Sequence, residues 1–513
     1  MAAKNMDFVD RMTLSYQPKG DCIPLGAAIL DGEVVSDAKV NLALKMMNRH
    51  GLIAGATGTG KTRTLQVMAE QLSDAGVPVF MLDVKGDLSG LAELGKTNDA
   101  LKKRAELVGL TFEPTSFPIE LFSLSGALGL PMRMTVESFG PVLLARVLDL
   151  NDTQTGVLTA VFKYAEDQQW DLVDFNDVKK LLTYLSDGPG AAAIEEDYGK
   201  ISKATAGTIL RKLVAVEQQG LAHIFGEKQF EITDLFRKCD GKGVISLLNI
   251  ADIQGQPLLF STFLLGLLAQ LFRNLPEVGD LDKPKLVFFF DEAHLLFKDA
   301  SKAFLSQVEQ IIRLIRSKGV GVFFCTQAAT DIPESILGQL GNRIQHALRA
   351  FTPNDADNLR KTVRTYPISS FYKIEEVLTS LGTGQALITA LNEKGVPTEV
   401  AATHLAPARS VMGPCSAETY SRLIQASELA VSYQIRVERR SAAEIVDERM
   451  RAFEQAQEQE KITTSRGKSK RTSIRQSPLE AAKSQASRTL AREGVKLLGK
   501  IASGILTAIF KKK

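Results

Sequence analysis

The sequence has few cysteines, and none of them is placed for a metal site or a disulfide framework. The four are Cys22, Cys239, Cys325 and Cys415. Zinc sites usually draw on closely spaced cysteine pairs, and small secreted proteins carry many cysteines at short range. The cysteine pattern therefore indicates neither arrangement and suits a reducing cytosol.

The sequence also lacks a secretory signal and a long uninterrupted apolar run. A signal peptide places a charged segment before an apolar one, and the first residues of this chain do not show that order. A membrane-spanning helix needs about 18 apolar residues, and no window of the chain is uninterrupted over that length. We expect a cytoplasmic protein.

The composition is that of a globular protein, with 44% hydrophobic and 24% charged residues. At 513 residues the chain is too long for one compact core, so two or three structural units are expected. The net charge is +3, but residues 461–513 contain fourteen Lys or Arg against two acids, which leaves residues 1–460 at −9. The basic character is confined to the tail. Charge alone gives no reason to assign nucleic-acid binding to the main part.

One stretch matches the phosphate-binding loop G-x-x-x-x-G-K-[ST] at every required position. Its residues are Gly55, Ala56, Thr57, Gly58, Thr59, Gly60, Lys61 and Thr62. The apolar run 51–54 leads in as a short buried strand, and 64–75 follows with helical spacing. Glycines allow backbone N–H groups to close around phosphate oxygens, and the helix adds its positive amino end. We expect Lys61 to reach the β- and γ-phosphates and Thr62 to place its hydroxyl on Mg²⁺.

Strands and helices alternate around this loop. Apolar strands are predicted at 77–83, 243–250, 285–292, 319–327 and 343–351, and helices at 258–273 and 303–317. Nearly continuous apolar strands are typical of a parallel sheet covered on both faces. The alternation predicts an α/β fold with right-handed crossovers.

We predict five regions along the chain. They are an N-terminal segment (1–50), an ATPase core (51–87 and 237–413), a helical insertion (88–236), a charged helical region (414–462), and a basic linker with an amphipathic C-terminal helix (463–513). The C-terminal helix is expected from apolar residues at helical spacing, which are Leu490, Leu497, Leu498, Ile501, Ile505 and Ile509. Such a helix packs against another subunit, lies on a membrane surface or binds nucleic acid, and the sequence does not separate the three.

A Mg²⁺-nucleotide site needs a second carboxylate at the end of a strand. Asp291 and Glu292 follow the apolar run 286–290. We expect Asp291 to hold the metal and Glu292 to orient and polarise the attacking water, which distinguishes an ATPase from a passive binder. His294 completes an Asp-Glu-Ala-His run and is given no catalytic role.

Two further residues follow from the order of the strands. Gln327 ends the strand after Asp291 and Glu292, where a polar side chain can sense the γ-phosphate. Arg343 begins the final strand and is a candidate arginine finger for a neighbouring subunit, with a surface ion pair as the alternative. Three other arginines compete for that role, namely Arg313, Arg316 and Arg349.

Several runs together resemble the bacterial YjgR family of HerA-like ATPases over roughly residues 45–415. They are N-R-H-G-L-I-A-G (48–55), D-V-K-G-D (83–87), F-D-E-A-H-L-L (290–296), I-R-S-K-G-V-G (315–321, running on to Gln327) and L-G-Q-L-G-N-R (337–343). The phosphate loop is specific by itself, and the other runs are specific in combination.

The resemblance implies a RecA-like core of the HerA/FtsK class with a hexameric ring, in which ATP is hydrolysed at subunit interfaces and double-stranded DNA is moved through the channel. By motif it implies phosphate and Mg²⁺ contacts at Lys61 and Thr62, a metal carboxylate at Asp291, and a base at Glu292. It further implies a sensor at Gln327 and a finger at Arg343. Only about fifty residues precede the phosphate loop, fewer than the N-terminal barrel of archaeal HerA contains.

We therefore predict a Mg²⁺-dependent ATPase of HerA type that acts as a DNA translocase or helicase. The alternative is a nucleotide-switched assembly protein that acts on a protein partner or membrane through the basic tail. The −9 balance of residues 1–460 favours the alternative, and the family motifs favour translocation. A small-molecule P-loop kinase fits less well, because no acceptor-binding motif is evident.

Overall fold

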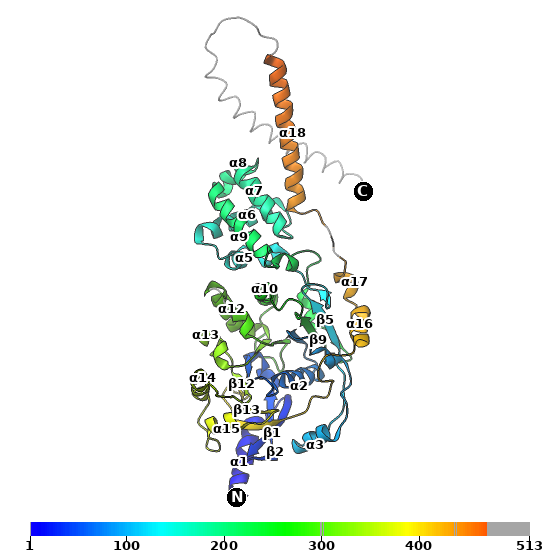
Figure 1. The fold of residues 1–513 in the computed structure, drawn as a ribbon, viewed down its shortest axis with the longest axis vertical. Coiled ribbons are helices and arrows are strands. Elements are labelled where there is room, and N and C mark those ends of the chain that lie inside the picture. The colour runs from blue at the N-terminus through cyan, green and yellow to red at the C-terminus, as the bar shows by residue number, and fades with distance from the viewer. Residues whose placement is uncertain (1, 298–299, 301, 436, 438, 469–513) are drawn as a thin grey trace. The chain divides into compact units, whose positions relative to one another are not determined.

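The computed structural model describes residues 2–297, 300, 302–435, 437 and 439–468. The chain divides into two compact units, Met1–Glu448 and Arg449–Lys513. Every site discussed below lies in the first unit (Figure 1). The predicted C-terminal helix, which begins near residue 479, lies outside the described residues.

A twelve-stranded sheet forms the centre of the first unit within the described residues. Its order is β2-β1-β14-β13-β12-β3-β11-β10-β4-β9-β5-β6. Neighbours from β12 to β6 are parallel, and β2, β1, β14 and β13 continue the sheet in antiparallel pairing. The strands are β1 (Cys22–Leu30), β2 (Glu33–Ala43), β3 (Gly51–Ala54), β4 (Val79–Asp83), β5 (Ile119–Ser123), β6 (Leu130–Pro131), β9 (Ile245–Asn249), β10 (Leu286–Phe290), β11 (Val320–Thr326), β12 (Asn342–Gln345), β13 (Gln385–Thr389) and β14 (Ala401–Leu405). A separate hairpin pairs β7 (Lys238–Cys239) with β8 (Lys242–Gly243).

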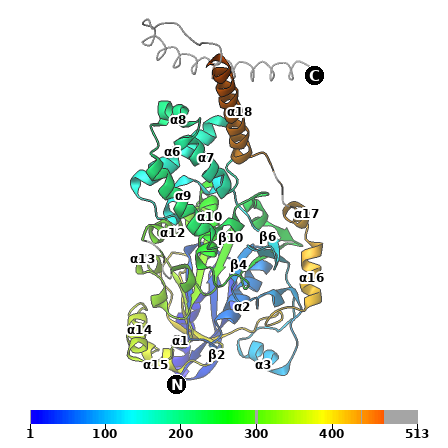
Figure 2. The same cartoon turned by 45° about the horizontal axis from the view of Figure 1, so that its top comes forward.

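Helices cover both faces of this sheet. Those nearest the sheet are α1 (Ala2–Tyr16), α2 (Lys61–Asp74), α3 (Asp99–Leu107), α10 (Pro257–Asn274), α11 (His294–Phe297), α12 (Lys302–Ile315), α13 (Glu334–Leu337), α14 (Pro353–Val363), α15 (Ile374–Ser380), α16 (Ala417–Ala426) and α17 (Ala430–Tyr433). Another group packs together beyond α10 and consists of α4 (Val136–Phe139), α5 (Pro141–Val147), α6 (Asp152–Gln168), α7 (Phe175–Asp187), α8 (Ala191–Tyr198) and α9 (Lys203–Glu217) (Figure 2). The last helix of the described residues is α18 (Ala442–Lys468).

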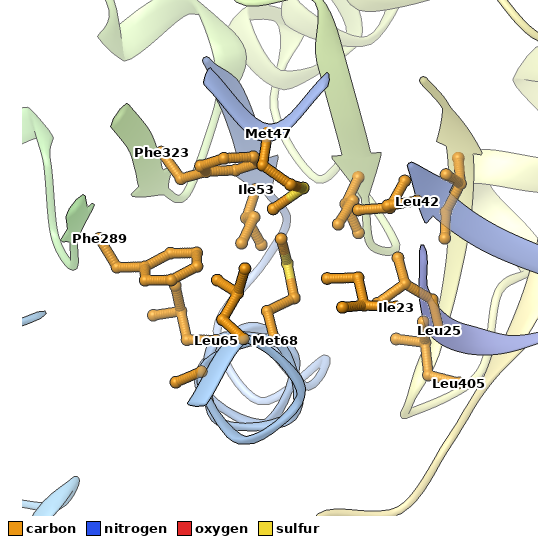
Figure 3. Close-up of a cluster of buried hydrophobic side chains, with 14 of the residues drawn as sticks. Ile23, Leu25, Leu42, Met47, Ile53, Leu65, Met68, Phe289, Phe323 and Leu405 are labelled. Carbon is orange, nitrogen blue, oxygen red and sulfur yellow. The ribbon is translucent and has the colours of Figure 1, made fainter. Parts of the chain in front are cut away.

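Successive residues of β10 point to opposite faces of the sheet, as the two-residue period of a strand requires. Phe289 joins the core cluster around Leu65 and Met68 of α2 (Figure 3). Phe290, on the other face, stacks against Phe324, which also contacts Phe297 of α11. Burial on both faces explains why these strands are nearly continuous apolar runs.

The sequence prediction of a mainly parallel α/β sheet is confirmed. The predicted final strand at 343–351 was too long, because the observed strand β12 ends at Gln345. The chain then leaves the sheet with a buried histidine, His346, beneath the phosphate loop.

Three predicted region boundaries need correction. The N-terminal segment 1–50 is part of the main sheet, since β1 pairs with β14 and its Ile23 joins the core cluster with Leu42 of β2 (Figure 3). The insertion 88–236 is not entirely helical, because β5 and β6 extend the parallel sheet beyond β9. The predicted linker begins too early, because α18 continues to Lys468.

Among the described residues, α10 is the one helix whose length and composition would allow it to cross a membrane. Within the protein, 72% of its apolar window is buried, and a single such helix is weak evidence for a span. Its apolar residues pack into the core of the first unit.

Candidate functional site

The glycine-rich loop 55–62 joins β3 to α2 at the carboxyl ends of the parallel strands. Three of its glycines have positive φ angles: 154° at Gly55, 79° at Gly58 and 114° at Gly60. Residues with a side chain rarely adopt these angles. At Gly55 there is also no space, because an added Cβ would lie 2.4 Å from the Cβ of His346. The loop shape therefore depends on glycine at these positions.

The Lys61 ammonium folds back over the start of the loop. It donates to the carbonyl oxygens of Gly55 at 2.8 Å and Ala56 at 3.3 Å. The buried Thr59 hydroxyl also donates to Ala56, at 2.7 Å, whereas Thr57 is exposed at the tip of the loop. Lys61 thus lies where phosphates bound in the loop would meet it.

His346 supports the loop from below, and no sequence motif pointed to it. Its Nε2 lies 2.8 Å from the Thr64 hydroxyl, and its backbone N–H donates to Ala54 at the end of β3. Burial lowers the pKa of His346 to about 4. The imidazole is therefore neutral near pH 7 and adds no charge beside Lys61.

The two predicted carboxylates follow β10, which lies next to β11 and one strand away from β3. Asp291 is 4% exposed, and burial raises its pKa, while a hydrogen bond with the Cys325 side chain on β11 partly offsets this effect. Cys325 in turn lies within the electrostatic influence of Lys61. The structure thus places Lys61, Cys325 and Asp291 one after another along the carboxyl ends of the parallel strands.

Glu292 occupies a left-handed backbone conformation with φ of 47°. Its Oε1 accepts a hydrogen bond from the Lys85 ammonium at 2.8 Å, and its Oε2 lies 3.5 Å from Nδ1 of His294. The pair with Lys85 raises the pKa of the Lys85 ammonium. A charged pair therefore joins the ends of β4 and β10.

Sequence reasoning missed the contact between Lys85 and Glu292. The signal that would have indicated it is the position of Lys85 just after β4, because β4 is the direct neighbour of β10. Asp83 fixes the intervening turn, since its carboxylate accepts from the backbone N–H groups of Gly86 (2.8 Å), Asp87 (3.2 Å) and Leu88 (3.1 Å). Burial raises the pKa of Asp83 to about 6.

Gln327 is exposed at the end of β11, directly beside the loop. The carbonyl of the preceding Thr326 accepts a hydrogen bond from the Gly55 N–H at 3.3 Å. The structure therefore brings Gln327 to the phosphate loop, and its role as a sensor stays a prediction.

Arg343 lies at the opposite end of the parallel strands, near their amino ends. It is the second residue of β12 and lies opposite Leu52, whereas the loop follows Ala54 at the other end of β3. Its guanidinium donates to the carbonyl oxygens of Leu337 and Leu340 at 3.4 Å each, and burial lowers its pKa. The structure does not bring Arg343 to the loop of its own chain.

The arginines that compete with Arg343 differ in their surroundings. Arg349 is exposed, and Arg313 pairs with Glu309 at 2.6 Å. Burial lowers the pKa of Arg316, which lies near Arg49. The geometry of a single chain does not select among them.

A cavity of 310 Å³ adjoins the loop on the side of α2. It is lined by loop and helix residues on one side and by the segment after β14 on the other, including Gly60, Arg63, Val67, Leu405 and Pro407. Arg104 closes the cavity by donating from Nε to the carbonyl of Leu405 at 2.9 Å. A larger groove of 670 Å³ between α14 and α15 contains none of the predicted site residues.

The oxygen groups in the site suit a magnesium ion. Mg²⁺ prefers oxygen ligands and is usually held by one or two carboxylates together with substrate phosphates. Thr62 in the first turn of α2 and Asp291 at the end of β10 offer a hydroxyl and a carboxylate. These are the residues that would hold the ion beside a nucleotide.

The fold and the site together define a RecA-like P-loop protein, with a phosphate loop after one parallel strand and an acidic pair after another. The family described as Helicase HerA-like C-terminal matches residues 29–507. The chain belongs to this family.

Individual relatives are distant. The chain is 23% identical over 368 residues to the DNA double-strand break repair helicase HerA of Sulfolobus acidocaldarius, a match that covers 69% of this chain and 64% of that protein. It is 25% identical over 399 residues to the DNA import protein CedB of the same organism, covering 75% and 58%. The chain thus spans less than two thirds of the length of these relatives.

A solved structure shares the fold. The bacterial conjugative coupling protein TrwBdeltaN70, in its complex with sulphate, matches with a TM-score of 0.50 at 12% identity, covering 79% of this chain and 92% of that one. The assignment to the YjgR proteins within the HerA-like class stays a prediction from the motifs.

Proposed function

We propose that this protein is a Mg²⁺-dependent ATPase that assembles as a ring and moves double-stranded DNA. The observation that carries the proposal is the meeting of the glycine-rich loop with Asp291 and Glu292 at one edge of a parallel sheet. A phosphate cradle beside a metal carboxylate and a second acid is the arrangement that nucleotide hydrolysis requires.

The residues of the chain divide the work of hydrolysis among them. Backbone N–H groups of loop 55–62 and the Lys61 ammonium bind the phosphates, and Thr62 and Asp291 hold the metal, which neutralises charge on the phosphates when bound. Glu292 accepts the proton of the attacking water. Gln327, beside Gly55, senses the γ-phosphate.

The 310 Å³ cavity beside the loop receives the nucleoside. It borders Gly60 and the first turns of α2, so a nucleotide whose phosphates lie in the loop would direct its base and ribose toward it. Val67 and Leu405 provide apolar surface for a base, and Arg104 holds the wall in place. Most ligand pockets have this mixture of apolar lining and a few polar groups.

Assembly would complete the site. Arg343 points away from its own loop and keeps a buried Nη1 without a hydrogen-bond partner in the described residues. A phosphate oxygen of the nucleotide bound to a neighbouring subunit would give this donor an acceptor, as an arginine finger does. The proposal of DNA as the substrate rests on the HerA and CedB relatives, whose names refer to DNA repair and DNA import. The proposal of a hexamer rests on the resemblance of the sequence motifs to the HerA/FtsK class. We place the protein in the cytoplasm.

One observation favours a second candidate, an assembly ATPase that acts on a protein partner or membrane without moving DNA. Residues 1–460 carry a net charge of −9, which gives no general attraction to the phosphate backbone. In this case the basic residues 461–513 would bind the partner or membrane surface.

Steady-state ATP hydrolysis with and without duplex DNA separates the two candidates. Translocation predicts stimulation by duplex DNA that falls steeply with salt, because bound phosphates release counterions. Mass measurement on the same sample, with nucleotide and DNA present, tests the ring. Absence of stimulation by any DNA, with full activity after removal of residues 461–513, would exclude translocation.

A further inference from the structure

In this structure both oxygens of the Glu292 carboxylate have a close neighbour, since Nδ1 of His294 lies 3.5 Å from Oε2 and Lys85 contacts Oε1. Oε1 is bound to the Lys85 ammonium at 2.8 Å. Oε2 is buried and has no hydrogen-bond partner in the described residues. The side chain as a whole is only 12% exposed. A general base must have a lone pair within hydrogen-bond reach of the water that it activates, and in this conformation the Lys85 ammonium competes with that water for Oε1.

Lys85 is presented to Glu292 by a turn that is held firmly from two sides. The three backbone N–H groups bound by Asp83 fix the turn from within. Gln254, from the segment after β9, donates to the carbonyl of Val84 and braces the turn from outside. The position of the Lys85 backbone is thus defined, and only its side chain is free to move.

The bond between Lys85 and Glu292 is easily exchanged. The Lys85 side chain is 51% exposed, and exposed ion pairs contribute little to stability. Asp291 and Asp87 also act on the ammonium, so it remains charged when it leaves Glu292. The triphosphate of a bound nucleotide would add a stronger concentration of negative charge at the same edge of the sheet.

The backbone of Glu292 is held in a strained conformation. Its φ of 47° is disfavoured for a residue with a side chain. The surrounding backbone holds it there, since the Glu292 N–H donates to Asp291 at 2.9 Å and the Ala293 N–H donates to the Cys325 carbonyl at 2.8 Å. Strain of this kind is common where a side chain must be aimed for function.

We propose that Lys85 is a positioning residue that withholds Glu292 from water until nucleotide binding draws the ammonium away. This inference rests on the proposed role of Glu292 in hydrolysis. It adds that one ion pair between the ends of β4 and β10 slows hydrolysis, and that opening of this pair precedes activation of the water.

The test is the hydrolysis rate of Lys85→Met without DNA. Loss of the pair removes a barrier of up to about 1 kcal/mol, so kcat should rise by about threefold to fivefold with little change in KM for ATP. A purely structural role would lower kcat or leave it unchanged. Lys85→Arg should retain the pair and the wild-type rate.

Lys163→Met is the matched control, because Lys163 forms exposed ion pairs with Glu166 and Asp167 on α6, in the helical group beyond α10. It should leave kcat unchanged. Lys85→Gln serves as a second variant if Lys85→Met does not fold, and circular dichroism establishes folding for each. Hydrolysis by Lys85→Met or Lys85→Gln at or below the wild-type rate would overturn the proposal. If neither the wild-type protein nor any folded Lys85 variant hydrolyses a nucleotide, the proposed function itself fails.

Discussion

His50 should make the folded protein sensitive to acid. This residue precedes β3 with φ of 57° and is 2% exposed. Its Nδ1 accepts a hydrogen bond from the Val322 N–H at 3.1 Å, so its Nε2 carries the proton and donates to the Ile312 carbonyl at 2.8 Å. One neutral imidazole thus ties together α12, β11 and β3. Protonation would place a second hydrogen where the Val322 N–H already points.

The magnitude follows from the pKa of His50, which burial lowers from 6.5 to about 4. The unfolded chain takes up a proton below about pH 6.5, whereas the folded protein resists protonation until about pH 4. The stability that the neutral residue contributes is therefore present above pH 6.5 and is lost as the pH falls from 6.5 to 4. The difference in pKa corresponds to about 3 kcal/mol.

The assay is urea unfolding of the wild type and of His50→Asn, followed by circular dichroism at pH 7.5, 6 and 5. Asparagine tolerates the positive φ and cannot titrate in this range. At pH 7.5 the variant should be less stable than the wild type, since it loses a buried hydrogen-bonded group. The difference in unfolding free energy between the two proteins should decrease steadily toward pH 5, because only in the wild type does folding keep neutral an imidazole that the unfolded chain would protonate.

His223→Asn is the control, because His223 is exposed. It shows how far replacing an exposed histidine with asparagine changes the unfolding free energy at each pH. A gap between the wild type and His50→Asn that stays constant from pH 7.5 to pH 5 would refute the reasoning.

Three further predictions concern the loop, its supporting helix and the candidate finger. Gly55→Ala should weaken the binding of a non-hydrolysable ATP analogue more than tenfold, as measured by calorimetry, because the new Cβ would clash with His346. Unchanged affinity would show that the loop accommodates the added Cβ. Glu70→Ala should lower the unfolding free energy by about 3 kcal/mol, since the buried carboxylate accepts hydrogen bonds from the backbone N–H groups of Arg409 and Ser410. A loss below about 1 kcal/mol would show that these hydrogen bonds contribute little to stability. Arg343→Ala should retain nucleotide binding and lose about a thousandfold in kcat. Arg211→Ala, at an exposed arginine of α9, serves as the control. Equal rates for the two variants would remove Arg343 from the finger role.

Sequence patterns predicted those elements whose structure is specified by a short local stretch of residues. The strands β3, β4, β10 and β11 are buried on both faces, so their apolar runs are visible without knowledge of their neighbours. The loop 55–62 is visible because its conformation needs glycine at fixed positions. The acidic pair Asp291 and Glu292 follows from the end of such a strand.

Other features depend on partners that are distant in the chain. β6 has only two residues and β5 includes the charged Glu120, whose carboxylate pairs with Arg237 at 2.7 Å. Neither strand has a pattern of its own; β5 is placed by its pairing with β9, and β6 by its pairing with β5. The strands β1 and β2 were underestimated for the same reason, since their place beside β14 is set by residues after position 400.

The site residues that sequence patterns did not predict also depend on partners that are distant in the chain. Lys85 acts on Glu292 across 207 positions of sequence, and His346 meets Thr64 across 282. Nothing within a short window distinguishes Lys85 from a solvated lysine in a turn. The order of strands in the sheet determines these contacts, and that order was not available from the spacing of motifs.

The measurement that tests the central claim most directly is ATP binding and ATP turnover by Glu292→Gln, compared with the wild type in the same buffer. Glutamine keeps the size of the side chain and removes its ability to accept a proton. The account predicts that the variant binds ATP with wild-type affinity while kcat falls by about a hundredfold or more. Turnover at the wild-type rate would contradict the assignment of Glu292 as the base and, with it, the proposed site of hydrolysis.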